Sequence, residues 1–346
     1  MFRSLIAAMF AITALGAAAS AEPLQLAQAP APTRVSIGVL RLSSSGPIFI
    51  ADARGYFRAE GLEPELKFFT AAQQVPVAVT SGDAEFGVTG LTAGFFNLAG
   101  RGALRIIASQ SREEPGYQLV AYMVTNQAYA NGLTSLRDLP GRRIGITTVG
   151  STFHYSLGLL ARKYNFDLAR VTMVPLQQLP NMAAAFKGGQ VDAILSPVTL
   201  ARQLEAENAG RIIGWVGDET PWQLGALFTS PRMIEQRRPV VEAFVRAYLR
   251  GAADYNRAFN QRDAAGREVQ GEGYREMIEI LARVLQQPAD RVAEGLPFVD
   301  PQGRLNVQDI HDQVAFWQAT GQANRDVDAR AIIDLSFVQG HFNLPR

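Results

Sequence analysis

The chain has 346 residues, with 33 Lys and Arg against 32 Asp and Glu, and it contains no cysteine. The charge balance gives no electrostatic case for binding nucleic acid or an anionic membrane. The lack of cysteine excludes disulfides, thiol nucleophiles and thiolate metal ligands. Because the length exceeds the usual limit of one hydrophobic core, about 250–300 residues, we expect two lobes.

The N-terminus has the pattern of a secretory signal peptide. Arg3 supplies a positive charge, an apolar run covers residues 5–19, and residues 19–21 (ASA) have the small-x-small pattern that signal peptidase requires. The apolar run is too short for a permanent membrane span. We predict a signal peptide over residues 1–21 and a flexible linker over residues 22–33 (EPLQLAQAPAPT). No cysteine follows the signal to carry a lipid, so we expect a Gram-negative periplasmic protein.

Two successive segments repeat one order of predicted strands and helices. The first has strands near residues 35–39, 63–69 and 85–88. One helix starts near residue 46, and a second helix ends near residue 80. The second has strands near 143–146, 171–175 and 189–194, with helices starting near residue 150 and covering 183–187. In both, an acid (Glu85, Asp192) follows a glycine by three positions. This repetition predicts two similar α/β lobes with mostly parallel sheets.

Two polar segments, residues 109–116 and 217–222, interrupt the pattern and each lies between two predicted strands. We interpret them as crossings between the lobes. Residues 34–110 and 225–346 then form lobe 1, and residues 111–224 form lobe 2. Apolar spacings of three and four predict a helix after Pro239. Further helices are expected around residues 274–285 and 307–319, all packed onto the first lobe.

Three segments resemble the nitrate/sulfonate/taurine-type substrate-binding proteins, a family that includes binders of the thiamine pyrimidine precursor. They are residues 51–62 (ADARGYFRAEGL), 133–145 (LTSLRDLPGRRIG) and 188–194 (GGQVDAI). The resemblance implies a periplasmic-binding-protein type II fold, with two βαβ lobes, a cleft between them and extra C-terminal helices. It also implies a small-molecule ligand and, as partner, an ABC permease with its ATPase subunit. We expect a monomer. We also expect the residues of the three segments mainly to stabilise the fold and not to contact the ligand.

Ligands of open α/β sheets bind outside the carboxyl ends of the strands, so the loops after predicted strands supply the candidate ligand contacts. The candidates are Ser43, Ser44, Ser45, Gly46, Gly90 and Thr92 in the first lobe, Ser151, Thr152, Phe153 and His154 in the second, and Trp222 on the second crossing. Structural alternatives stay open. A hydroxyl at a helix start often only caps the helix, His154 can be an ordinary inter-element histidine, and Trp222 can belong to the core.

Two ligand classes also stay open. Helix N-termini with hydroxyls suit a small organic anion such as a sulfonate or carboxylate, whereas Phe153 or Trp222 suits a planar heteroaromatic ring. We expect no catalytic residue, metal or cofactor, because the three histidines are widely spaced and no catalytic or nucleotide-binding motif is present.

The alternative function is an enzyme of the pyrimidine-precursor synthase-like branch of the same fold. The eukaryotic relative uses a pyridoxal lysine and a Cys-rich motif. Here only three lysines exist (Lys67, Lys163 and Lys187) and cysteine is absent. We therefore interpret the chain as a binding protein that is not an enzyme.

Overall fold

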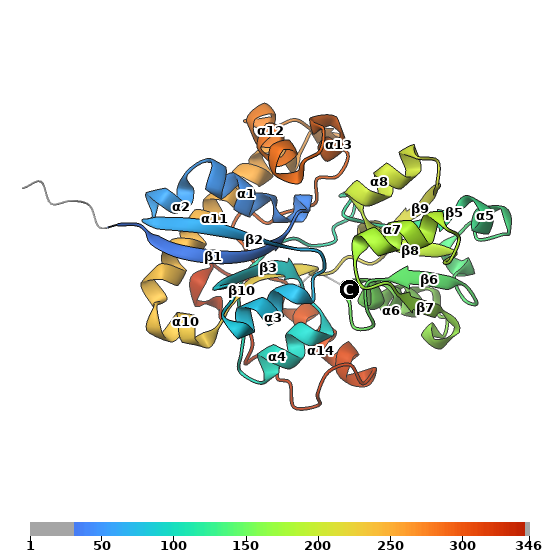
Figure 1. The fold of residues 1–346 in the computed structure, drawn as a ribbon, viewed down its shortest axis with the longest axis horizontal. Helices are drawn as coiled ribbons and strands as arrows, with labels where there is room; N and C mark the ends of the chain where they lie inside the picture. The colour runs from blue at the N-terminus through green and yellow to red at the C-terminus, as the bar shows by residue number, and fades with distance from the viewer. Residues whose placement is uncertain (1–30, 343–346) are drawn as a thin grey trace, which may run out of the picture. The chain divides into compact units, whose positions relative to one another are not determined.

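The computed structural model describes residues 31–342, in which two five-stranded sheets share one strand order (Figure 1). The first sheet has the order β2-β1-β3-β10-β4 and the second β7-β6-β8-β5-β9. Each sheet has one antiparallel strand, β10 or β5, which is the strand that the chain enters after crossing between the sheets. The shared order confirms the prediction of two similar, mostly parallel α/β lobes.

The bounds of the elements follow the predicted pattern closely. The strands of the first sheet are β1 (Thr33–Leu40), β2 (Leu62–Phe69), β3 (Phe86–Gly90), β4 (Arg105–Ser109) and β10 (Gly225–Thr229), and its connecting helices are η1 (Ser43–Ser45), α1 (Gly46–Ala53), α2 (Tyr56–Ala59), α3 (Gln74–Ser81) and α4 (Ala93–Gly100). The strands of the second sheet are β5 (Val120–Thr125), β6 (Arg143–Ile146), β7 (Thr172–Pro175), β8 (Ala193–Pro197) and β9 (Gly210–Trp215). The helices around it are α5 (Asn126–Ala130), η2 (Leu136–Asp138), α6 (Thr152–Tyr164), η3 (Leu168–Arg170), α7 (Leu179–Lys187), α8 (Val198–Ala206) and α9 (Val216–Glu219). The C-terminal part holds α10 (Pro231–Gln236), α11 (Arg238–Phe259), β11 (Gln261–Arg262), β12 (Glu268–Val269), α12 (Tyr274–Leu285), α13 (Ala289–Ala293), α14 (Val307–Ala319) and η4 (Leu335–Phe337).

The repeated acid has the same structural task in both lobes. The backbone N–H of Ser36 on β1 donates to Glu85 Oε2 at 3.2 Å, and that of Arg143 on β6 donates to Asp192 Oδ2 at 2.8 Å. Glu85 thus joins the segment before β3 to the neighbouring strand β1, and Asp192 joins the segment before β8 to the neighbouring strand β6. The sequence repeat therefore marks a strand-pairing contact and not a ligand site.

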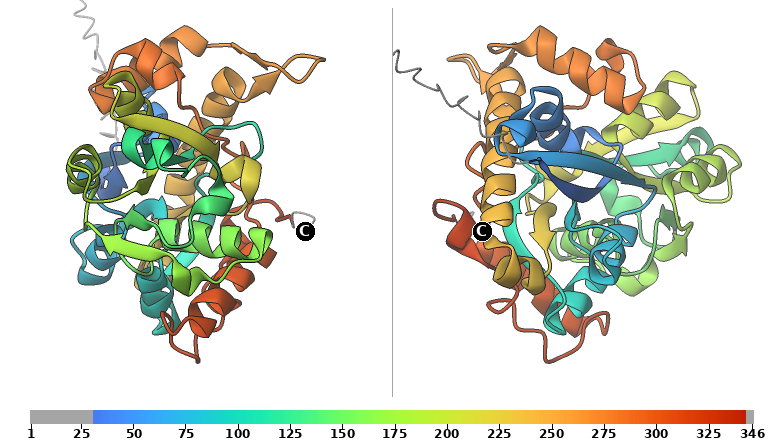
Figure 2. Two further views of the ribbon diagram at one scale, coloured as in Figure 1. Left: turned by 90° about the vertical axis from the view of Figure 1, so that its right-hand side faces the viewer. Right: turned by 60° about the vertical axis from the view of Figure 1, so that its left-hand side comes forward.

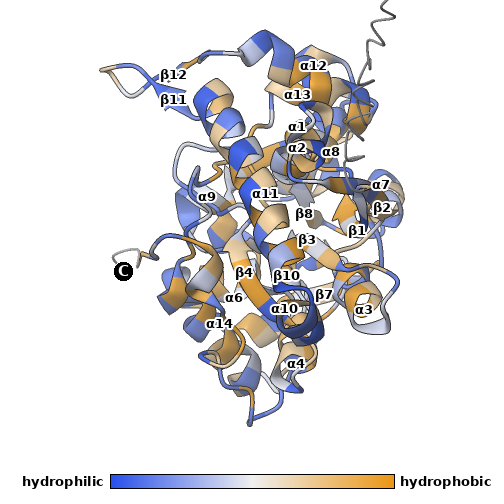
Figure 3. Ribbon diagram, turned by 90° about the vertical axis from the view of Figure 1, so that its left-hand side faces the viewer, coloured by the Kyte–Doolittle hydropathy of each residue, from blue (hydrophilic) through white to orange (hydrophobic). Residues whose placement is uncertain are grey.

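Helix α11 closes the core of the first lobe. Its buried face packs on the sheet and on α1, and Figure 3 shows hydrophilic and hydrophobic residues on the same helix. The ring of Phe244 stacks on Phe86 with centroids 3.7 Å apart. Gly251 lets α1 approach, because a Cβ at this position would lie 2.2 Å from the carbonyl oxygen of Pro47. The apolar stripe that predicted this helix is its buried face.

Helix α14 differs from the expectation that all C-terminal helices pack onto the first lobe. Helix α12 packs on α1, but α14 contacts α4 of the first lobe and, through its aromatic rings, α6 of the second. In both views of Figure 2, the orange α12 lies at the top and the red α14 at the bottom. The ring of Phe316 on α14 lies 5.1 Å from that of Tyr155 on α6, and Trp317 lies 5.3 Å from His154. An amphipathic pattern identifies a buried face without saying which neighbour buries it, which explains the error.

Residues 1–30 hold the expected signal peptide and most of the expected linker, and these predictions fall outside the described residues. From Pro32 onward the chain groups as one compact unit, so the exact lobe boundaries stay a prediction. Within residues 31–342, no helix is both long and apolar enough to cross a membrane.

Candidate ligand-binding site

A cavity lies where the carboxyl ends of parallel strands from the two sheets face each other. The space has an empty volume of about 600 Å³, open solvent included. The first sheet and its loops contribute Leu40, Leu42, Ser44, Ser45, Thr70, Ala71, Ala72, Thr89, Gly90, Gln110 and Leu224. The second contributes Leu119, Val120, Thr147, Thr152, Phe153, Leu179 and Pro197.

Strand direction explains why these residues meet. Leu40 and Gly90 end parallel strands of the first sheet, and Pro197 ends one of the second. The antiparallel strands begin where their parallel neighbours end, since Val120 pairs with Pro197 and Gly225 pairs with Gly90. Both kinds of strand therefore bring their loops to one edge of each sheet, and both edges face the cavity.

Five of the eleven predicted contact residues line the cavity: Ser44, Ser45, Gly90, Thr152 and Phe153. The other six, Ser43, Gly46, Thr92, Ser151, His154 and Trp222, are absent from its wall. Two of these six act as helix caps. Thr92 Oγ1 accepts the N–H of Phe95 at 3.1 Å, and Ser151 Oγ accepts the N–H of His154 at 3.4 Å.

Two others of the six are packed within the core. A Cβ on Gly46 would lie 2.6 Å from the ring of Tyr255, so this glycine serves close packing. Trp222 is fully buried, and its indole lies 4.7 Å from the ring of Tyr155. Ser43 is buried in η1. The structure therefore favours the alternative in which Trp222 belongs to the core.

His154 supports the second-lobe loop from within. Its Nδ1 accepts the backbone N–H of Gly150 at 3.0 Å, and the side chain is 4% exposed. Burial lowers the pKa of His154 to about 4, so its imidazole is neutral at pH 7. The carbonyl of Gly150 in turn accepts the N–H of Ala93 on α4 at 2.9 Å. His154 thereby shapes a contact between the two lobes.

Ser45 and Gln110 are the unsatisfied polar groups of the cavity wall. Ser45 occupies the N-cap position of α1 without a capping hydrogen bond from its side chain, and it is 1% exposed. Ser45 Oγ and Gln110 Oε1 have no hydrogen-bond partner among the described residues. A buried polar group without a partner costs about 1–3 kcal/mol. A ligand in the cavity can supply what these two side chains lack.

Several wall residues were not predicted from the sequence. Thr70, Gln110 and Thr147 each follow directly after a parallel strand: β2, β4 and β6, respectively. The signal was present, because the rule that ligands collect at carboxyl strand ends applies to every parallel strand. The predicted contacts came only from loops with a serine-rich or glycine-rich pattern.

No Asp, Glu, Lys, Arg or His is found among the residues that line the cavity. Two arginines, Arg41 and Arg112, lie within two residues of a wall residue in sequence, and both are engaged elsewhere. Arg41 donates to the carbonyl of Val284 at 2.7 Å, and Arg112 donates to Glu114 Oε2 at 2.5 Å. Within the described part of the chain, no cluster of three or more His, Asp and Glu could hold a metal ion.

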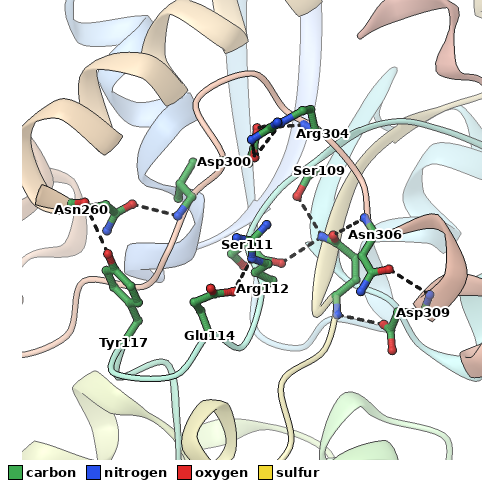
Figure 4. A network of polar contacts seen from close by, with 12 residues as sticks. Ser109, Ser111, Arg112, Glu114, Tyr117, Asn260, Asp300, Arg304, Asn306 and Asp309 are labelled. Carbon is green, nitrogen blue, oxygen red and sulfur yellow. Dashed lines mark hydrogen bonds and ion pairs between the residues drawn. The ribbon is translucent and has the colours of Figure 1, made fainter. Parts of the chain in front are cut away.

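The two crossings between the sheets are joined to the C-terminal segment by a polar network (Figure 4). Gln223, on the second crossing, donates through Nε2 to Ser109 Oγ at 2.9 Å and to the carbonyl of Gly225 at 2.8 Å. Its Oε1 accepts the N–H of Asn306 at 3.1 Å. Figure 4 shows Ser109, Arg112 and Tyr117 around the first crossing beside Asp300, Arg304 and Asn306. The crossings are therefore held by a third segment.

A family model described as NMT1/THI5 like matches residues 43–258 of the chain. A curated relative, the 4-amino-5-hydroxymethyl-2-methylpyrimidine phosphate synthase of Schizosaccharomyces pombe, is 24% identical over 169 residues. That match covers 46% of this chain and 43% of the relative, so the chain spans less than half the length of the curated relative it matches.

Solved structures show the same fold at low sequence identity. The alkanesulfonate-binding protein SsuA from Xanthomonas axonopodis pv. citri, bound to MOPS, has a TM-score of 0.70 and 20% identity, over 89% of this chain and 100% of that chain. The periplasmic nitrate-binding protein NrtA from Synechocystis PCC 6803 has a TM-score of 0.68 and 13% identity, over 87% and 85% of the two chains. The chain thus has the periplasmic-binding-protein fold that its sequence predicts.

Proposed function

The chain belongs to the NMT1/THI5-like family, and we propose that it is the periplasmic solute-binding component of an ABC importer. The observation that carries this proposal is the cavity itself, since both sheets contribute walls to one space of about 600 Å³. A ligand held by two lobes is released when they separate, which suits capture and delivery. The likeness to binding proteins for alkanesulfonate and nitrate supports the same conclusion.

The remaining parts of the proposal follow from this role. A protein that serves an importer is exported, in agreement with the signal-like pattern that ends at Ala21. Its partners are a small molecule and a permease with an ATPase subunit, and it works as a monomer. The two crossings, residues 109–116 and 217–222, are the hinges about which the lobes close. The ligand is a small organic molecule of the anion or planar heteroaromatic class.

The alternative is an enzyme related to the pyrimidine phosphate synthase, and the lysines weigh against it. None of the three lysines lines the cavity. Lys67 Nζ donates to the carbonyl of Asp83 at 2.7 Å, while Lys163 and Lys187 form ion pairs with Glu219 and Glu207. A synthase that holds a pyridoxal group on a lysine needs that amine in the reaction cavity. The geometry therefore supports binding in preference to chemistry.

Native mass spectrometry of the exported protein tests the proposal. We expect the wild-type chain, purified gently from the periplasm, to carry one non-covalent small molecule. Ala72→Trp should abolish this bound mass, because Ala72 is a half-buried residue of the cavity wall and an indole there fills the space. Val77→Trp is the matched control, since Val77 is 57% exposed on α3 and lies outside the cavity wall.

Two outcomes would contradict the proposal. One is a bound mass that persists in Ala72→Trp, and the other is the absence of any bound molecule from the wild-type chain. The enzyme alternative has its own readout. If the released molecule is returned to the protein and recovered chemically changed, the chain is a catalyst; a binding protein returns it unchanged.

A further inference from the structure

We propose that the cavity selects an uncharged ligand, one that presents a neutral group with both a hydrogen-bond donor and an acceptor to Ser45 and Gln110. A carboxamide, a sulfonamide or an amino-substituted heteroaromatic ring has such a group. This inference rests on the proposed binding function and narrows the ligand class, because it excludes the small organic anions that the helix N-termini around the cavity suggest.

The cavity wall contains no charge to compensate an ion. None of its residues is ionisable at neutral pH, and Arg41 and Arg112 donate to partners outside the wall. The nearby His154 is neutral at pH 7, since burial lowers its pKa to about 4. Moving an ion from water into such a space is costly unless it is paired or fully hydrogen-bonded. The lack of charged side chains in the cavity wall therefore favours a neutral ligand.

Backbone N–H groups can replace a cation at helix N-termini, but those around this cavity are largely occupied. The caps described above take up the N–H of Phe95 on α4 and of His154 on α6. The N–H groups of Thr70 and Ala71 donate to Gln74 Oε1, at 3.0 and 3.2 Å. The N–H groups of Thr152 and Phe153, the first two of α6, remain available, but with no cationic side chain in the wall they compensate an anion only in part.

The unsatisfied wall atoms fit a neutral polar group. A serine hydroxyl and a glutamine amide each offer both a donor and an acceptor, whereas an anion offers only acceptors. Ser45 Oγ and Gln110 Oε1 are both unpartnered and buried. A ligand group with an N–H and a C=O, or an N–H and a ring nitrogen, offers the donor and the acceptor that match such side chains.

The rest of the wall is apolar and comes from both lobes. Leu42 and Leu224 belong to the first sheet and its loops, and Leu119, Phe153 and Leu179 belong to the second sheet and its loops. Burying apolar ligand surface against them contributes about 25 cal/mol for each Å². The wall therefore suits a ligand with a compact apolar or aromatic body and one polar end.

Two pairs of probes of nearly equal shape test the charge of the ligand: benzamide against benzoate, and benzenesulfonamide against benzenesulfonate. Affinities are measured with the full exported chain at pH 7, by thermal shift and by calorimetry. We expect the neutral member of each pair to bind at least tenfold more tightly than its anion. Equal or tighter binding of the anions, or no binding of any probe at about 10 mM, would overturn the proposal.

Ser45→Ala tests the polar end of the site. Because Ser45 Oγ has no partner in the described chain, its removal should leave the melting temperature of the ligand-free protein unchanged or raised. The affinity for the neutral probes should fall at least fivefold. Ser43→Ala is the matched control, since Ser43 lies in the same short helix but outside the cavity wall. Equal affinities in wild type and Ser45→Ala would refute the assigned contact.

Ala72→Trp separates this inference from the proposed function. If the anions bind more tightly and Ala72→Trp abolishes their binding, the cavity is a ligand site and only the charge class is wrong. If Ala72→Trp leaves the binding of every probe intact, the cavity is not the ligand site. The proposed function, which rests on this cavity, is then wrong as well.

Discussion

Gln223→Leu should lower the free energy of unfolding by about 3–4 kcal/mol, the largest effect that we expect from one uncharged substitution. Leucine has a similar volume but no hydrogen-bonding groups. Its introduction leaves Ser109 Oγ, two carbonyl oxygens and the N–H of Asn306 without this partner in a buried site. A buried group left without any partner costs about 1–3 kcal/mol. This applies to Ser109 Oγ and the N–H of Asn306, because the carbonyls of Ser111 and Gly225 keep backbone hydrogen bonds.

Urea unfolding followed by circular dichroism measures this loss. Gln236→Leu is the control, because Gln236 is an exposed residue that accepts a hydrogen bond from Arg232, one turn away on α10. It should change the free energy of unfolding by less than about 0.5 kcal/mol. A loss below about 1 kcal/mol for Gln223→Leu would mean that the network in Figure 4 is not what holds the crossings together.

Acidification from pH 7 to pH 5 should remove about 2 kcal/mol of stability through His154 alone. The pKa of His154 is about 4 in the folded protein, against 6.5 for an ordinary histidine. Between these values the unfolded chain binds more protons, so stability is complete above pH 6.5 and is lost as the pH falls toward 4. Protonation would also place a hydrogen on Nδ1, which accepts the N–H of Gly150.

His154→Asn isolates this contribution, since an asparagine oxygen can take the place of Nδ1 as acceptor. Between pH 7 and pH 5, the wild type should lose about 2 kcal/mol of unfolding free energy relative to His154→Asn. The comparison is needed because burial raises the pKa of Glu113 well above its usual range. Glu113 has the opposite pH dependence, with stability lost as the pH rises. Parallel pH profiles of the two proteins would contradict the assignment to His154.

The fold could be predicted from the sequence because its signals are local and repeated. Alternating apolar residues mark β1, glycines mark the helix ends, and Glu85 and Asp192 recur at equal distance from a glycine. The second lobe repeats the order of strands and helices of the first, and this repetition supports the fold assignment more strongly than any single strand. The neighbours of α14 were not predictable in this way. Its amphipathic pattern is satisfied equally by one lobe or by two, and only the structure brings Phe316 to Tyr155.

The candidate site could be predicted only as a set of loops. Ser45, Thr92 and Ser151 are all hydroxyl residues at helix starts, and nothing in the sequence distinguishes them. The structure does, because Thr92 and Ser151 cap their helices while Ser45 has no partner among the described residues. Gln110 carries no pattern of its own beyond its place after β4. Its place in the cavity wall depends on how the loops after the strands come together, which is a tertiary property.

A crystal structure of the protein with its captured small molecule is the most direct test of the central claim, that the space between the two lobes is a ligand-binding site. We predict density for the molecule inside the cavity, with its polar end at Ser45 and Gln110 and its apolar body against Phe153. Density only in the surface hollow between Arg202 and Glu268, with the interlobe cavity unchanged, would contradict the account.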